Sequence, residues 1–130
     1  MELEDDQMCF ACGMKNQDGL QLQFQLEGED GICTEFAAPK KFQGFKDIVH
    51  GGIIATIFDE VMVNLVYLRG IKAVTARLEV HLKKPARVGE RLVFHGRIIK
   101  EAGRTVEARA EARNQEGTLI AEAKGLLVKV

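Results

Sequence analysis

An apolar segment in the middle of the chain leaves a helix almost no surface for solvent, and this constrains the fold more than any other feature. Over residues 51–68 the only charged side chains are Asp59 and Glu60. Gly70 follows, and glycine suits the left-handed position beyond a helix end, so we expect a helix over 51–68. A helix that is apolar nearly all round, in a chain of 130 residues, must be enclosed. A curved antiparallel sheet and a second copy of the chain would enclose it.

Alternation of apolar and polar side chains predicts the strands of such a sheet, because it gives each strand one face for the core and one for solvent. Segments with this pattern or with strand-like composition are 20–26, 32–36, 77–82, 92–100, 106–113 and 119–130. Turn-forming residues separate them, as at 29–31. In 106–113 the apolar positions are mainly alanine, which would let this strand pass close to the helix. The expected fold class is α+β, with a central helix wrapped by a curved antiparallel sheet of about six strands.

Composition and charge exclude several classes of protein. The 18 basic residues are balanced by 19 acidic ones, whereas nucleic-acid-binding proteins normally carry a basic excess. The first residues are acidic and no run of about 18 apolar residues occurs, so we expect neither a secretion signal nor a membrane span. We therefore expect a single domain over 1–130, cytoplasmic, with no nucleic-acid or membrane partner.

The predicted helix begins at the motif His50-Gly51-Gly52, and an acid follows on the same helix. Backbone N–H groups at a helix N-terminus have no acceptor within the helix and carry partial positive charge, so they can stabilise an oxyanion. Asp59 lies about two turns further on, and a carboxylate can activate water or attack a carbonyl carbon itself. This combination suits thioester chemistry.

Several other stretches accompany the motif. They are Cys9-Phe10-Ala11-Cys12-Gly13, the apolar alternation of 19–24, Phe42-Gln43-Gly44-Phe45, and Val49 just before the histidine. With the acid nine residues after the histidine, the chain resembles the hot-dog-fold acyl-CoA thioesterases, in particular the phenylacetate-pathway and thioesterase-superfamily-member branch. The resemblance covers nearly the whole chain. It implies hydrolysis of an acyl-CoA to free coenzyme A and a carboxylic acid by a homodimer or homotetramer that needs no cofactor.

The resemblance also implies roles for individual residues. Gly51 would donate its amide to the thioester carbonyl, and Asp59 would be the general base or the nucleophile. In this branch a Ser or Thr at the start of the strand after the helix orients the attacking water, and the matching residue is Thr75. Many members place an Asn or Gln six residues before the histidine, where this chain has Gly44, so Gln43 is the nearest side-chain amide.

Candidates for substrate binding lie around the motif and at the end of a predicted strand. We expect His50 to be a structural residue of the helix start and Gly52 to allow close packing against a neighbouring strand. Coenzyme A carries phosphates that basic side chains can hold, although a basic cluster is more often simply a solvated surface. The substrate-binding candidates are His50, Gly52, Gln43, Lys83, Lys84 and Arg87.

Two other functions remain open for a chain of this kind. A non-catalytic module that binds or senses acyl-CoA would share the fold and Gly51. A hydratase of the same fold uses an Asp and a His five residues apart, whereas Asp47 and His50 are three apart here. Glu60 points about 100° around the helix from Asp59, so we expect it to be a bystander or an interface residue.

The cysteines predict no metal site. Cys9 and Cys12 form a lone Cys-x-x-Cys pair within an N-terminal segment, residues 1–18. A zinc site needs four ligands, and the remaining cysteine and three histidines offer no second close pair. We therefore expect reduced, structural thiols.

Overall fold

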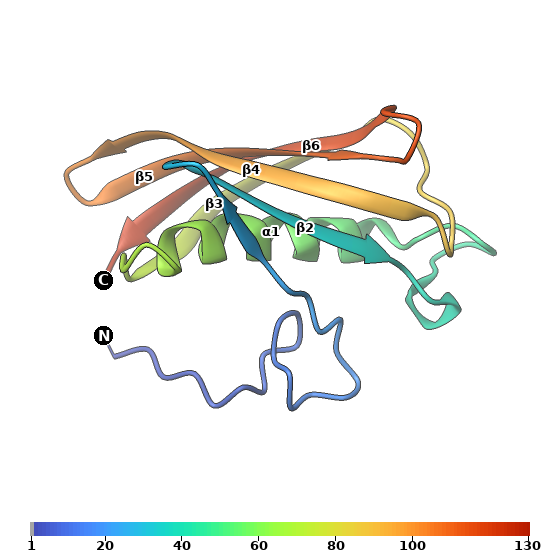
Figure 1. Cartoon of the computed structure of the whole chain (residues 1–130), viewed down its shortest axis with the longest axis horizontal. Helices are drawn as coiled ribbons and strands as arrows, with labels where there is room; N and C mark the ends of the chain where they lie inside the picture. The colour runs from blue at the N-terminus through green and yellow to red at the C-terminus, as the bar shows by residue number, and fades with distance from the viewer. Residues whose placement is uncertain (1) are drawn as a thin grey trace.

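A computed structural model describes residues 2–130 and shows one helix beneath a single sheet (Figure 1). The helix, α1, spans Gly51–Tyr67, and a short 3-10 helix, η1, spans Lys40–Phe42. The six strands are β1 Gln25–Glu27, β2 Gly31–Ala37, β3 Ala73–Leu82, β4 Arg91–Ala102, β5 Thr105–Arg113 and β6 Leu119–Lys129. The strands and helix therefore follow the order that the sequence predicts.

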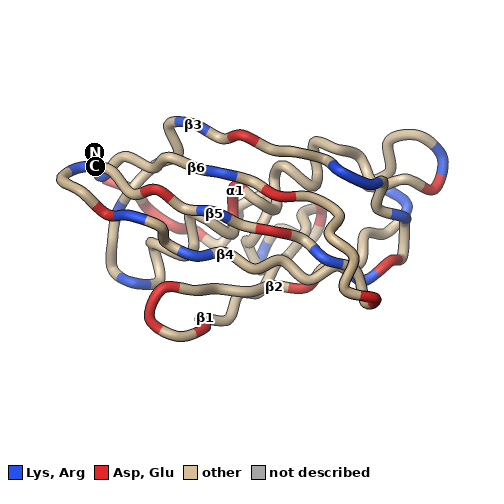
Figure 2. The backbone as a smooth tube through the Cα atoms, turned by 90° about the horizontal axis from the view of Figure 1, so that it is seen from above, with Lys and Arg blue, Asp and Glu red and all other residues tan. Residues whose placement is uncertain are grey.

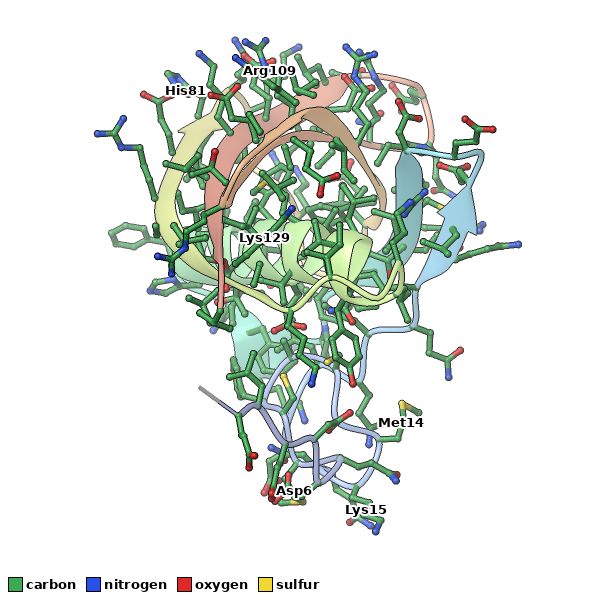
Figure 3. The ribbon with its side chains drawn as sticks, turned by 90° about the vertical axis from the view of Figure 1, so that its left-hand side faces the viewer. Asp6, Met14, Lys15, His81, Arg109 and Lys129 are labelled. Atoms are coloured by element: carbon green, nitrogen blue, oxygen red, sulfur yellow. The ribbon has the colours of Figure 1, made fainter. Side chains whose placement is uncertain are left out.

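The sheet is antiparallel throughout, with the strand order β1-β2-β4-β5-β6-β3. Seen along the helix axis, the sheet forms an arch over α1 (Figure 3). Its outer face is polar: His81 and Arg109 point away from the helix in Figure 3, and both signs of charge are distributed along β4, β5 and β6 in Figure 2. The expected α+β fold, a central helix wrapped by a curved six-stranded sheet, is confirmed.

Small residues on the sheet let the helix approach it closely. The alanines of β5 that face the helix, Ala108, Ala110 and Ala112, are all buried, as the sequence predicted. Two glycines add to this: a Cβ at Gly96 would lie 2.6 Å from a Val61 methyl, and a Cβ at Gly125 would lie 2.7 Å from the Met62 sulfur. Phe58 of the helix packs edge-on against Phe94 of β4, with ring centroids 5.2 Å apart.

Local signals in the sequence set both ends of α1. His50 is the N-cap, and its side chain accepts the N–H of Gly52. Gly70, just past the helix, has a φ of +80°, the left-handed conformation that the sequence predicted. Among residues 2–130, no helix is both long enough and apolar enough to cross a membrane.

The predicted first strand, 20–26, is wrong over most of its length, because only Gln25–Glu27 pairs as β1. Gln21 has a φ of +52°, which breaks an extended strand. The amides of Leu20 and Leu22 donate to the carbonyls of Phe10 and Ala11 instead of to a strand. Leu20 and Leu22 are buried all the same, because this stretch folds together with the N-terminal segment against the core.

That N-terminal segment runs beneath α1, on the side away from the sheet (Figures 1 and 3). Asp6, Met14 and Lys15 mark its outermost part in Figure 3. Part of the helix surface that the sequence assigned to a second copy of the chain is therefore covered by the chain itself.

Candidate active site

A cleft of about 580 Å³ opens at the N-terminus of α1. Its walls come from the loop before the helix, from the helix start and from the turn after β3. The lining residues are Gly44, Phe45, Ile48, Val49, His50, Gly51, Leu82, Lys83, Lys84, Pro85 and Ala86. The cleft therefore combines apolar side chains with a helix N-terminus and two lysines.

The two glycines of the motif have different roles. The Gly52 N–H is used within the chain, because it donates to Nδ1 of His50 at 2.9 Å. The Gly51 N–H has no acceptor among the described residues, and Gly51 lines the cleft. A free N–H at the positive end of a helix dipole can hold an oxyanion, so Gly51 is the donor that the cleft offers.

The predicted reason for Gly52 is wrong. A Cβ at Gly52 would lie 3.0 Å from Nδ1 of His50 and 3.2 Å from its Cε1, so the absent side chain makes room for the histidine ring and not for a strand. His50 in turn has the structural role expected of it, because its ring caps the helix.

Asp59 is held by Thr75. The Thr75 hydroxyl donates to Oδ1 of Asp59 at 2.7 Å, and both residues are half-buried. The sequence singled out both residues, and the structure joins them across 16 positions of the chain. A hydrogen bond from Thr75 fixes the direction of one carboxylate oxygen and leaves the other for a substrate or a water molecule.

An irregularity in β3 allows this contact. Thr75 pairs with Leu127 of β6 and Arg77 pairs with the preceding residue, Leu126, so Ala76 is an extra residue, a β-bulge. Without the bulge, Thr75 and the core residue Leu78 would point to opposite faces of the sheet, because side chains alternate along a strand. The bulge lets both face the helix.

Within one chain, Asp59 and the Gly51 amide lie at separate places. They are eight positions apart on α1, which corresponds to about 12 Å along the helix axis. Groups that act on one carbonyl must each lie within about 3 to 3.5 Å of it. A single copy of the chain therefore presents the two halves of the predicted site without joining them.

The remaining candidates for substrate binding differ in their positions. Lys83 and Lys84 line the cleft; Lys83 is paired with Glu122 at 3.3 Å, whereas Lys84 forms no ion pair within residues 2–130. Arg87 is exposed beyond the cleft, where its backbone pairs with Ile48. Lys84 is thus the lysine whose charge is available for an anionic ligand.

Gln43 and Gly44 share the place where the resemblance expects an amide. The Gln43 side-chain oxygen accepts the N–H of Asp47 at 3.0 Å, so it shapes the loop. Gly44 lines the cleft, and a Cβ there would lie 3.4 to 3.7 Å from atoms of His50, which is ordinary van der Waals distance. The position matching the family's amide is therefore open and next to the histidine.

Glu60, the neighbour of Asp59, contacts the N-terminal segment. Cys9 Sγ lies 3.5 Å from Oε1 of Glu60, and the Asn64 amide donates to Oε2 at 2.9 Å. Burial, together with the adjacent Glu60 carboxylate, raises the pKa of the Cys12 thiol. No pattern in the sequence indicates this contact, since Cys9 and Glu60 are 51 positions apart and neither belongs to a motif that includes the other.

Comparison with known families accounts for this cleft and helix. A model of the Thioesterase superfamily matches residues 46–121, which include α1, Thr75 and all the cleft residues except Gly44 and Phe45. The chain belongs to this superfamily. The Acyl-coenzyme A thioesterase THEM4 of Mus musculus is 34% identical over 118 residues, which cover 88% of this chain and 51% of the mouse protein. The chain spans about half the length of the curated THEM4 relatives it matches.

Solved structures share the fold at low sequence identity. The Escherichia coli PaaI protein from the phenylacetic acid degradation operon is 16% identical, with a TM-score of 0.80 over 85% of this chain and 80% of its own. A hypothetical thioesterase protein from Streptococcus pneumoniae TIGR4 with coenzyme A is 17% identical, with a TM-score of 0.77 over 83% of this chain and 86% of its own. The streptococcal protein has also been solved as two alanine variants, one at an aspartate and one at a threonine 16 positions later.

Proposed function

We propose that this member of the Thioesterase superfamily is an acyl-CoA thioesterase that releases coenzyme A and a carboxylic acid. Asp59 activates a water molecule or attacks the thioester carbon itself, and the Gly51 N–H stabilises the oxyanion that forms on the carbonyl. The observation that carries the proposal is the hydrogen bond from Thr75 of β3 to Asp59 of α1. The N-terminal amide of the same helix, that of Gly51, is free and lies at the cleft. The helix thus supplies both a positioned carboxylate and an oxyanion donor.

Two of the comparisons support these roles. The streptococcal protein was solved with an aspartate replaced by alanine and, separately, with a threonine replaced by alanine. These two residues are 16 positions apart, as are Asp59 and Thr75. That protein was also solved with coenzyme A. In this chain, we propose that Thr75 orients Asp59 and the water molecule, and that Lys84 binds a phosphate of coenzyme A, with Lys83 and Arg87 as weaker contributors.

We propose further that the active site is shared between two copies of the chain. Asp59 and Gly51 of one chain are about 12 Å apart along the helix axis. If the α1 helices of two copies run antiparallel, Asp59 of one copy lies near Gly51 of the other, and the two groups can act on one substrate. The edge strand β3 is ten residues long and unpaired on one side, which suits the joining of two sheets. Phe45 and Leu82 at the cleft are 88% and 56% exposed, and a second copy or an acyl group would cover them.

We also propose that the protein works in a reducing compartment such as the cytoplasm. All three cysteines of the chain are free, which is usual for proteins of a reducing compartment.

A panel of acyl-CoAs, assayed for release of free thiol, tests the reaction. We expect turnover with at least one acyl chain, and a fall of about 10² to 10⁴-fold in Asp59→Asn, which keeps the size of the side chain but removes the charge. Unchanged binding of acyl-CoA by the inactive variant would separate lost chemistry from lost affinity. Binding without any thiol release by the wild-type chain would favour the alternative, a non-catalytic acyl-CoA module.

Complementation between two inactive variants tests the shared site. Gly51→Pro removes the N–H but suits the first helical position, and the preceding residue, His50, already has a φ of −59° and a ψ of 130°, which proline tolerates. Gly51→Ala keeps the N–H and is the matched control. Refolded together, Asp59→Ala and Gly51→Pro chains should recover about one quarter of wild-type activity, because half of the dimers are mixed and each has one intact site. No recovery, or a folded and active monomer in sedimentation at micromolar concentration, would contradict a shared site.

A further inference from the structure

Outside the cleft, three side chains that can bind metals meet on the side of α1 that faces away from the sheet. Cys9 and Cys12 come from the N-terminal segment, and Glu60 comes from the helix. Their sulfur and carboxylate oxygen atoms all lie within 4.8 Å of one another, and each residue is half-buried. The cluster lies between the N-terminal segment and α1, since Cys9 contacts Glu60, and Figure 1 shows this segment below the helix. The proposed thioesterase reaction uses none of the three.

The turn that carries the cysteines is shaped around the Cys9 sulfur. The N–H groups of Ala11 and Cys12 both point at Cys9 Sγ, at 3.4 Å. The Gly13 N–H donates to the Cys9 carbonyl at 2.8 Å, and a Cβ at Gly13 would lie 2.4 Å from the Cys9 nitrogen, so only glycine fits there. Two N–H groups directed at one sulfur fix the position of Cys9 Sγ next to Cys12 and Glu60.

Glu60 is fixed in place without a positive partner. The Asn64 amide holds its second oxygen, and the Asn64 side chain also donates to the Glu60 carbonyl at 2.9 Å. Within residues 2–130, no lysine, arginine or histidine forms an ion pair with Glu60. Two thiols and one carboxylate therefore converge where a cation would supply the missing charge.

We propose that Cys9, Cys12 and Glu60 bind one Zn²⁺ ion, with water in the fourth position. Zinc takes thiolate and carboxylate ligands tetrahedrally, and ligand atoms around it are about 3.3 to 3.8 Å apart, so small side-chain movements suffice. Two thiolates disfavour Mg²⁺ and Ca²⁺, which prefer oxygen ligands. Binding releases the two thiol protons to solvent and leaves the oxidation states of zinc and sulfur unchanged.

This inference departs from the expectation drawn from the sequence, which considered only cysteine and histidine spacing. The third ligand comes from the helix, far from the Cys-x-x-Cys pair in the chain. A zinc ion there would join residues 9–12 to α1 beside Asp59, through Glu60.

Metal content is the first test. The full chain is purified under reducing conditions without chelator, loaded with ZnCl₂, dialysed and analysed for zinc by mass spectrometry. We expect about one zinc per wild-type chain, at least a tenfold loss in Cys9→Ser/Cys12→Ser, and about tenfold or greater weakening by Glu60→Gln in competition with a chelator. The matched control is Cys33→Ser, since Cys33 also lies near carboxylates, those of Glu27 and Glu35, but has no second thiol.

Thiol labelling of the wild-type chain gives a second test that needs no variant to fold. With ZnCl₂ present, alkylation of Cys9 and Cys12 by iodoacetamide should slow at least tenfold, while that of Cys33 stays unchanged. Less than about one tenth of a zinc per wild-type chain, equal zinc in the double-serine variant, loss of zinc in Cys33→Ser, or unprotected Cys9 and Cys12 would each overturn the proposal.

Discussion

Asp59 and Glu60 are adjacent acids on one helix, yet they belong to two different parts of the molecule. Asp59 turns toward β3 and accepts the Thr75 hydroxyl, whereas Glu60 turns toward the N-terminal segment and contacts Cys9. One step along a helix rotates a side chain by about 100°, and in this small domain that rotation moves it from the sheet to the segment beneath the helix. The partners of a side chain, and not its type, therefore decide which of two neighbouring carboxylates can serve the reaction.

The largest expected effect is on kcat, which should depend on Asp59 and not on Glu60. Asp59→Ala should lower kcat by about 10² to 10⁴-fold, because the base or nucleophile is lost while alanine preserves the helix. Glu60→Gln should keep turnover within about threefold, since its side chain points away from the site. Thiol release from the best acyl-CoA checks both. Near wild-type activity in Asp59→Ala would remove the catalytic assignment.

Thr75 gives the next largest effect. Thr75→Val keeps the shape of the side chain but deletes the hydroxyl, and a hydrogen bond to a charged group contributes about 1.5 to 3 kcal/mol, so kcat should fall about 10 to 150-fold. Thr75→Ser keeps the hydroxyl and should stay within a few-fold of wild type. If valine and serine behave alike in the same assay, the Thr75 hydroxyl does not position Asp59.

Hydrogen exchange tests the role of Glu60 in holding the N-terminal segment. The amides of Leu20 and Leu22 donate to the N-terminal segment, so their exchange reports whether that segment stays docked. Glu60→Ala should speed their exchange about tenfold, because the contact with Cys9 is lost, whereas Asp59→Ala should leave it unchanged. Equal protection in the two variants would mean that Glu60 does not hold the segment.

The smallest effect concerns the two lysines of the cleft. Lys84→Ala should raise KM for acyl-CoA by a few-fold, with kcat nearly unchanged, because a solvated lysine contributes about 1 kcal/mol to binding a phosphate. Lys83→Ala should change KM less, because Lys83 is paired with Glu122. A larger effect at Lys83 in steady-state kinetics would reverse the assignment.

The parts of the structure that the sequence could predict rest on local signals. Gly70 acts on its own neighbours in the chain, so the end of the helix can be worked out from the sequence. The alanines of β5 recur at every second position, so the sequence also shows that one face of this strand carries small side chains. The shortened β1 could not be predicted, because apolar alternation over 20–24 looks the same whether the backbone pairs with a strand or with a loop. The positive φ of Gln21 and the bonds to Phe10 and Ala11 depend on tertiary packing.

The candidate site divides in the same way. The motif and its resemblance pointed to Gly51, Asp59 and Thr75, but the hydrogen bond that joins the last two depends on a bulge with no mark in the sequence. The sequence also could not show that His50 uses the Gly52 amide, since that follows from a ring orientation. The contact between Cys9 and Glu60 joins residues that no local pattern relates.

The bulge at Ala76 sets how β3 tolerates changes in length. A strand with strict alternation can lose two residues and keep its faces, but loss of one exchanges them. Deletion of Ala76 alone would make β3 regular, and then either Thr75 or the core residues Leu78 and Val80 would have to turn outward. The side chain of Ala76 takes part in no proposed step. Its presence as an extra residue nevertheless lets Thr75 face the site while Leu78 and Val80 face the core.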